Sequence, residues 1–272
     1  MIVLCAAILF VVLAWMVCSS RVVILVLGRW VLHCRYDVSL TGASCIDSAL
    51  TYLIVPNHPA IVDPMIVATE LHHLHLDVRP LVDESFFSSI VARHILDLFD
   101  AVRVPDFRRL SFCPTPKVRP SRCDSVCRAK SLVTVVLDTL THGRNVLLYP
   151  SGHITEDGRE TMSNRQLAYN VISQLPVNIH VLGIRTRGLY GSIWSRAGGR
   201  SAPHFVKTVI KSVLRWPVAW FKPKRKVGIH FEDITEMCSN LVTRGRAGFN
   251  AGLEGWYDSD LKQIGEVSEK TT

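Results

Sequence analysis

The chain has 272 residues, of which 48% are hydrophobic, and a formal net charge of +8 at pH 7. This composition excludes a disordered chain, and the length allows one large domain or two small ones. The positive charge indicates an anionic partner, which is a nucleic acid, a membrane surface or an acidic substrate carrier. The eight cysteines form no C-x-x-C pair and no Cys/His spacing of zinc-site type, so we expect free thiols in a reducing compartment and no metal.

The N-terminal segment has the composition of a membrane anchor. Residues 1–18 carry no charge and reach about the minimum length of a bilayer-spanning helix, and a second apolar stretch follows at residues 22–33. The basic residues and the A-x-A-like site of a cleaved signal peptide are missing. We therefore expect residues 1–35 to form a membrane-associated helix or helical pair, in which residues 22–33 span the membrane, re-enter it or lie flat on it. The basic residues after the first span place the remainder of the chain on the cytoplasmic side (Arg21, Arg29, Arg35).

Beyond residue 36, short apolar segments alternate with helical patterns. Strands are expected at residues 52–55, 145–149, 177–184 and 226–231. Helices are expected at residues 64–74 and 128–142, the second with Gly143 as its C-cap. Strands separated by helices predict an α/β domain with a mostly parallel sheet flanked by helices.

The domain boundaries follow from the same pattern. We expect this domain to span residues 36–263, with a flexible tail at residues 264–272. Four prolines between residues 104 and 121 preclude regular structure there and indicate a flexible segment.

A polar turn interrupts two apolar segments after the first predicted strand. Asp63 there precedes Pro64, an ordinary N-cap and N1 pair at the start of a helix, and His58 is then a polar turn residue. A second interpretation is chemical, because ligand sites of α/β proteins lie at the carboxyl ends of parallel strands. There a histidine acts as general base on a hydroxyl, and an aspartate five residues on fixes its tautomer. Both roles of Asp63 are compatible.

Two segments resemble the glycerolipid acyltransferase superfamily, the lysophosphatidic acid acyltransferase-like enzymes. Residues 57–64, NHPAIVDP, resemble its N-H-x4-D block, and residues 143–155, GRNVLLYPSGHIT, resemble the strand and turn usually written F-P-E-G-T-R-S. The order and spacing of the two blocks agree with the family, and the resemblance covers about residues 36–260. It implies an acyltransferase-like fold.

The resemblance also implies an activity. Such enzymes move a fatty acyl group from acyl-CoA or acyl-carrier protein to the hydroxyl of a lysophospholipid or related glycerolipid, with the thioester as co-substrate and no further cofactor. It makes His58 the general base and Asp63 the residue that orients it. Residues expected to contact substrate are Asn57, Pro150, Ser151, Gly152, His153, Thr155 and Arg159.

The third block departs from the family pattern. Ser151 and His153 stand where the family has Glu and Thr, and Ile154 and Thr155 where it usually has Arg and Ser. The phosphate-recognising arginine therefore has no direct counterpart, and Arg159 is close in sequence. Two alternatives stay open: a transacylase that takes its acyl group from another phospholipid, and a degenerate lipid-binding or scaffold homologue. A serine nucleophile is disfavoured, because Tyr149 replaces the leading glycine of a G-x-S-x-G elbow.

The charge of the chain is concentrated in one segment. Residues 196–226 contain nine Lys or Arg and no acidic residue, with Trp216 and Trp220 among them. Basic residues beside tryptophan are typical of elements that lie on anionic lipid headgroups. A second basic stretch, residues 103–130, is a candidate for the phosphates of CoA or the acidic face of a carrier protein. We expect membrane lipids as partners, and no nucleic acid, since no binding motif is present.

Overall fold

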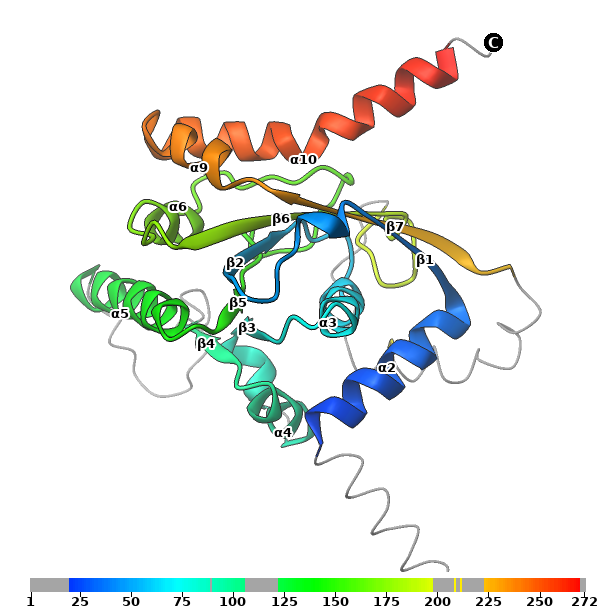
Figure 1. The fold of residues 1–272 in the computed structure, drawn as a ribbon, viewed down its shortest axis with the longest axis horizontal. Coiled ribbons are helices and arrows are strands. Elements are labelled where there is room, and N and C mark those ends of the chain that lie inside the picture. Colours follow the sequence, from blue (N-terminus) through cyan, green and yellow to red (C-terminus); the bar gives the residue numbers. More distant parts are fainter. Residues whose placement is uncertain are drawn as a thin grey trace, which may run out of the picture.

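The computed structural model describes residues 20–88, 90–105, 122–197, 208, 211 and 223–269. Seven strands form one sheet in the order β1-β7-β6-β2-β5-β3-β4 (Figure 1). Their bounds are β1 Tyr36–Thr41, β2 Thr51–Pro56, β3 Val78–Asp83, β4 Val102–Val104, β5 Asn145–Leu147, β6 Ile179–Arg187 and β7 Arg225–Asp233. Every neighbouring pair is parallel except β6 and β7, which are antiparallel. The expected mostly parallel sheet is therefore confirmed.

Helices cover both faces of this sheet. Their bounds are α2 Arg21–Arg35, α3 Asp63–His73, α4 Ile90–Leu98, α5 Arg122–Thr141, α6 Leu167–Ile172, α9 Thr235–Val242 and α10 Gly245–Glu269, and two short 3₁₀ helices are η1 Ala43–Cys45 and η2 Glu84–Ser88. One core cluster joins the sheet to α5, α6, α9 and α10, and a second joins it to α2 and α3. The sheet is thus the middle of three layers (Figure 1).

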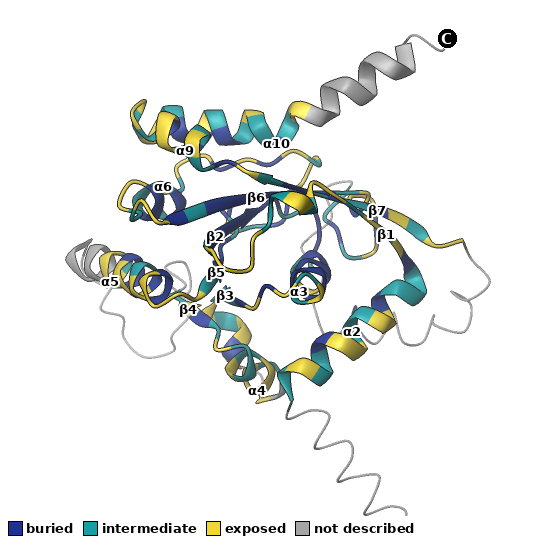
Figure 2. Ribbon diagram, in the orientation of Figure 1, coloured by how far each residue is buried: buried dark blue, intermediate teal, exposed yellow. Residues whose placement is uncertain are grey.

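Strand β2 lies between the two cores. Leu53 and Val55 pack in the cluster with α5 and α10, whereas Tyr52 and Ile54 pack in the cluster with α3. All four side chains are fully buried, because successive residues of a strand point to opposite faces and both faces are covered (Figure 2). This explains the continuous apolar run that precedes His58.

The predicted strands are all present, whereas β1, β3 and β4 were not predicted. The missed strands lie toward the two edges of the sheet and are partly exposed, so their sequences lack a continuous apolar run. The predicted helix at residues 128–142 corresponds to α5, which begins earlier, and Gly143 has the positive φ of 74° expected of a C-cap.

The predicted cap of α3 is wrong. The helix begins at Asp63 itself, Val62 occupies the N-cap position, and no side chain makes a cap hydrogen bond. Val62 already has helical dihedral angles, so the helix starts one residue closer to the N-terminus than predicted. The Asp63 carboxylate is thereby left available for an interaction other than capping.

The last helix extends beyond the predicted end of the domain. Helix α10 continues to Glu269, and the flexible tail expected at residues 264–272 stays a prediction. Strong helix formers precede this segment (Leu261, Lys262, Gln263), and residues 264–269 contain two glutamates and no proline, so the helix is not interrupted.

Helix α2 packs against α3 through a buried carboxylate. Glu70 of α3 is 1% exposed, and its Oε1 lies 2.6 Å from His33 Nε2 and 3.2 Å from Arg29 Nε. Helix α2 has 15 residues, which are too few to cross a bilayer. No helix in the described part of the chain combines the necessary length and apolar character. Part of the expected anchor, residues 1–19, lies outside the described residues. The same holds for residues 106–121 of the basic stretch 103–130 and for residues 198–222 of the basic segment 196–226, except 208 and 211.

Candidate active site

Three strand ends bring the polar residues of the site together. His58 follows the end of β2, Tyr149 follows the end of β5, and Thr186 lies near the end of β6. The three strands are adjacent, and β2 is parallel to both neighbours, so their carboxyl ends meet at one edge of the sheet. Asp63 reaches the same place from the first turn of α3. The sequence prediction that His58 and Asp63 lie at this edge agrees with the structure.

His58 and Asp63 form a close pair that is largely buried. His58 Nδ1 lies 4.0 Å from Asp63 Oδ2, and the side chains are 16% and 0% exposed. The ring of Tyr149 packs on the imidazole at a centroid distance of 4.5 Å. Burial, together with nearby His153, lowers the pKa of His58 to about 3. The imidazole is therefore unprotonated at neutral pH, which is the form that a general base needs.

Asp63 carries its carboxyl group inside the protein. Burial raises its pKa to about 8, and the hydroxyl groups of Thr186 and Tyr149 oppose this rise. Neither hydroxyl reaches Asp63 with full hydrogen-bond geometry, so both carboxyl oxygens are buried without a regular partner. Buried polar atoms without partners are rare in folded proteins and gather at functional sites. A positive charge formed on His58 interacts directly with this carboxyl group.

The backbone of His58 is held by the loop that follows β5. The His58 N–H donates to Glu160 Oε2 at 2.9 Å, and the Thr155 N–H donates to the His58 carbonyl oxygen at 3.0 Å. Glu160 and Thr155 are both 3% exposed. Both backbone hydrogen-bonding groups of His58 are therefore fixed, so the loop sets the position of the imidazole.

Asn57 joins the ends of β2 and β6. Its side-chain amide donates to the Thr186 carbonyl oxygen at 3.1 Å, and its side-chain oxygen accepts from the Thr186 N–H at 2.7 Å. With 3% exposure, Asn57 is buried, and both ends of its amide are satisfied within the protein. Asn57 thus fixes the neighbouring strand end beside His58, and its predicted contact with substrate stays a prediction.

The turn at residues 150–155 closes on itself beside His58. The Ser151 hydroxyl, fully buried, donates to the His153 carbonyl oxygen at 3.0 Å, and His153 Nδ1 lies 2.8 Å from the Ser151 carbonyl oxygen. Gly152 is exposed and has a φ of 60°. Pro150 and Ser151 are buried, so Gly152 and His153 are the members of this turn that remain accessible.

Arg159 lies apart from the imidazole. It is exposed, and its charge, like that of Arg187, opposes the rise that burial causes in the pKa of Asp258 on α10. No described contact joins Arg159 to His58, so its predicted role in binding the acceptor stays a prediction.

Sequence reasoning missed three residues of the site. Thr186 and Tyr149 follow or end buried strands, and that position at the carboxyl edge was the available signal. Glu160 gave no such signal, because it ends a polar run at residues 156–160 that is typical of a solvated loop.

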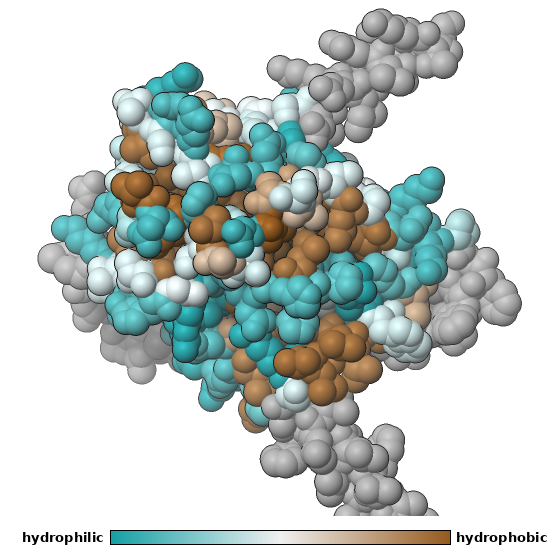
Figure 3. Space-filling model, viewed as in Figure 1, coloured by the Kyte–Doolittle hydropathy of each residue, from teal (hydrophilic) through white to brown (hydrophobic). Residues whose placement is uncertain are grey.

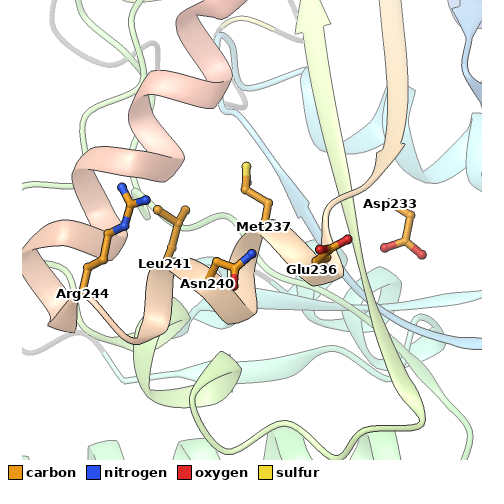
Figure 4. Close-up of a pocket in the computed structure, with 6 residues that line it drawn as sticks. All are labelled: Asp233, Glu236, Met237, Asn240, Leu241 and Arg244. Atoms are coloured by element: carbon orange, nitrogen blue, oxygen red, sulfur yellow. The ribbon is translucent and has the colours of Figure 1, made fainter.

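A hollow of about 460 Å³ lies elsewhere, along α9 (Figure 4). It is lined by Asp233, Glu236, Met237, Asn240, Leu241 and Arg244. Asp233 pairs with His180 at 2.9 Å, and His180 stands in register with Tyr52 at the start of β2. The hollow therefore lies near the amino end of β2, whereas His58 lies beyond its carboxyl end. The described residues contain no group of three or more His, Cys, Asp or Glu that is arranged to hold a metal ion.

Comparison with known proteins decides the family. Residues 37–185, more than half of the chain, match the family described as Acyltransferase. The chain belongs to the Acyltransferase family. The matched range contains His58, Asp63 and the whole loop that holds them. The resemblance to the lysophosphatidic acid acyltransferase-like superfamily, inferred from two short blocks, is thereby confirmed.

A solved structure supports the fold of this acyltransferase family member. The 1-acyl-sn-glycerophosphate (LPA) acyltransferase PlsC from Thermotoga maritima matches with a TM-score of 0.50 over 82% of this chain and 76% of that one. The two sequences are 14% identical, so the match concerns the fold. A search of curated proteins finds no match to the chain.

The two hydrogen bonds between the Asn57 side chain and the Thr186 backbone predict that substitution of Asn57 lowers the stability of the protein. Asn57→Ala leaves the N–H and carbonyl of Thr186 buried without partners, and we expect the free energy of unfolding to fall by about 2–4 kcal/mol. Thr186→Val is the matched control, because it keeps both backbone groups and we expect a loss below about 1 kcal/mol. Urea denaturation measures both. Equal losses for the two variants would show that the Asn57 side chain does not hold the strand ends together.

Proposed function

We propose that the chain transfers a fatty acyl group from a thioester, acyl-CoA or acyl-carrier protein, to the hydroxyl of a lysophospholipid or related glycerolipid. The observation that carries this proposal is the pair of His58 and Asp63, 4.0 Å apart and almost completely buried, within a domain of the Acyltransferase family. The likeness in fold to the 1-acyl-sn-glycerophosphate acyltransferase of Thermotoga maritima supports a glycerolipid acceptor.

The proposed reaction is a direct transfer. His58 takes the proton of the acceptor hydroxyl while that oxygen attacks the thioester carbonyl, so the acyl C–O bond forms and the C–S bond breaks. The ionised form of Asp63 stabilises the imidazolium that forms beside it, and the raised pKa of about 8 makes this form predominant above that pH. The proton then passes to the departing thiolate, which leaves as a thiol. No acyl-enzyme is formed, and the burial of the Ser151 hydroxyl in its own turn supports this choice over a serine nucleophile.

Two alternatives differ in the acyl donor or in activity. A transacylase takes its acyl group from another phospholipid and leaves thioesters unused. A non-catalytic lipid-binding homologue lacks transfer from any donor. The unprotonated, buried imidazole beside a carboxyl group favours catalysis over the second alternative, because burying two ionisable groups is costly and a scaffold gains nothing from it.

The mechanism predicts how substitutions at the pair affect acyl transfer. His58→Ala removes the base, and we expect kcat to fall by about 10²- to 10⁴-fold. Asp63→Asn removes the support of the imidazolium but leaves the base, so we expect a smaller loss. The assay measures transfer of a radiolabelled acyl group from acyl-CoA, acyl-carrier protein or a diacyl phospholipid to a panel of lysophospholipids.

His72→Ala is the matched control for this assay. His72 lies in the last turn of α3, where it pairs with the exposed Asp77 at 3.1 Å outside the site, so full activity is expected. Circular dichroism confirms that each variant is folded. Undiminished transfer by folded His58→Ala disproves the catalytic role, and transfer from phospholipid with none from either thioester establishes the transacylase.

We further propose that the protein works at a membrane, with residues 1–35 as its anchor and the catalytic domain on the cytoplasmic side. The uncharged sequence of residues 1–18 supports this proposal. So do exposed apolar side chains along α2, where Val22, Val26 and Trp30 are 54%, 55% and 62% exposed and lie on one face at a spacing of four residues. Apolar side chains gather over this part of the molecular surface in Figure 3.

The two expected modes of attachment are separable by truncation. We expect the full chain to stay in membranes washed with carbonate, and a chain lacking residues 1–19 to be released. The shortened chain is expected to bind anionic vesicles at low salt through the basic segment at residues 196–226, since each basic residue near such a surface contributes roughly 1 kcal/mol. Vesicles of neutral lipid are the control. Carbonate release of the full chain contradicts the anchor, and absence of binding to anionic vesicles contradicts the basic surface.

A further inference from the structure

Glu160 is a buried acid that the proposed reaction leaves without a role. It lies 102 residues from His58 in the sequence, yet its Oε2 accepts the His58 N–H at 2.9 Å. Its other carboxyl oxygen, Oε1, is buried without a hydrogen-bond partner. A carboxyl group is costly to bury, so its place beside the catalytic histidine calls for a function.

The surroundings of Glu160 connect it to the altered third block. The Ser151 hydroxyl lies close enough to lower the pKa of Glu160, although its regular hydrogen bond goes to the His153 carbonyl oxygen. Ser151 stands where the family pattern has a glutamate. A carboxyl group is thus present next to Ser151, but it belongs to Glu160, nine residues further along the chain.

The charged groups around Glu160 come from several elements. Asp258 and Glu254 on α10 raise its pKa, whereas Ser151 and the His58 N–H lower it. Glu160 in turn interacts with the carboxyl group of Asp63 and with Tyr149 and Tyr257. Burial has the largest effect, and the pKa of Glu160 is raised to about 7. The group therefore ionises within the physiological range.

We propose that Glu160 is a positioning residue for His58: it fixes the base through the backbone N–H and, when ionised, stabilises the imidazolium formed as the substrate proton is taken up. This inference rests on the proposed function. Glu160 does not touch the reacting atoms in this arrangement. It acts through His58, and it supplies the carboxylate that the family pattern places at the position of Ser151.

The kinetic test compares Glu160→Gln with Glu160→Ala in the full-length chain. Gln keeps an oxygen that accepts the His58 N–H but carries no charge, whereas Ala loses both. We expect the wild-type kcat to rise by about tenfold as pH passes 7. In Glu160→Gln this step is expected to be absent, which leaves only the rise that follows ionisation of Asp63 near pH 8, with little change in KM. Glu160→Ala is expected to lose about 10²-fold in kcat at every pH, because the base is no longer fixed.

Glu70→Gln is the control of equal burial. Glu70 is 1% exposed and pairs with Arg29 and His33, away from the site. We expect it to lower the unfolding midpoint and to leave the shape of the pH profile unchanged. A pH profile of Glu160→Gln equal to that of the wild type overturns the proposed role in catalysis.

A second measurement does not depend on activity. The NMR shift of the His58 backbone amide is expected to titrate near pH 7 in the wild-type chain and to stop doing so in Glu160→Gln, because the ionising group accepts that N–H. An amide that titrates identically in both proteins overturns the inference. If the amide behaves as expected but the wild-type chain transfers acyl groups from no donor, the proposed function fails and the contact between Glu160 and His58 stands.

Discussion

The two hydrogen bonds that hold the His58 backbone are the constraint on which the site depends. One comes from the Thr155 N–H and the other goes to Glu160, and both partners belong to the loop after β5. His58 itself follows β2, so these bonds tie two adjacent strand ends together. Asn57 ties β2 to its other neighbour, β6. The position of the imidazole is therefore fixed by the ends of three adjacent strands, β5, β2 and β6, in a sheet that is buried on both faces.

Rigidity of this kind has a chemical use. The pair of His58 and Asp63 lies where charge is poorly solvated, which lowers the pKa of the imidazole and raises that of the carboxyl group. The same environment strengthens the interaction between them once a proton arrives from substrate. Fixed groups need little reorganisation at that moment. The Glu160 carboxyl group adds a second acid on the backbone side of the same histidine.

The parts of this site that the sequence predicts are those that depend on local pattern. The buried strands before His58 and Tyr149 appear as continuous apolar runs, and the order of strands and helices predicts that their carboxyl ends meet. The edge strand β1 shows no such run because it is half exposed. Glu160 was not predictable, since its contact with His58 spans 102 residues and follows from the path of a loop. Helix α3 starts one residue before the predicted position because the helical dihedral angles begin at Val62.

The central claim is that His58 activates the acceptor hydroxyl for direct attack on the donor. It is tested most directly by rapid chemical quench of the full-length protein after mixing with a radiolabelled acyl thioester, with and without a lysophospholipid. Direct transfer predicts no label on the protein under either condition, and labelled lipid only when the acceptor is present. An acyl group bound covalently to the protein, at Ser151 or elsewhere, that passes to lipid when the acceptor is added would contradict the account.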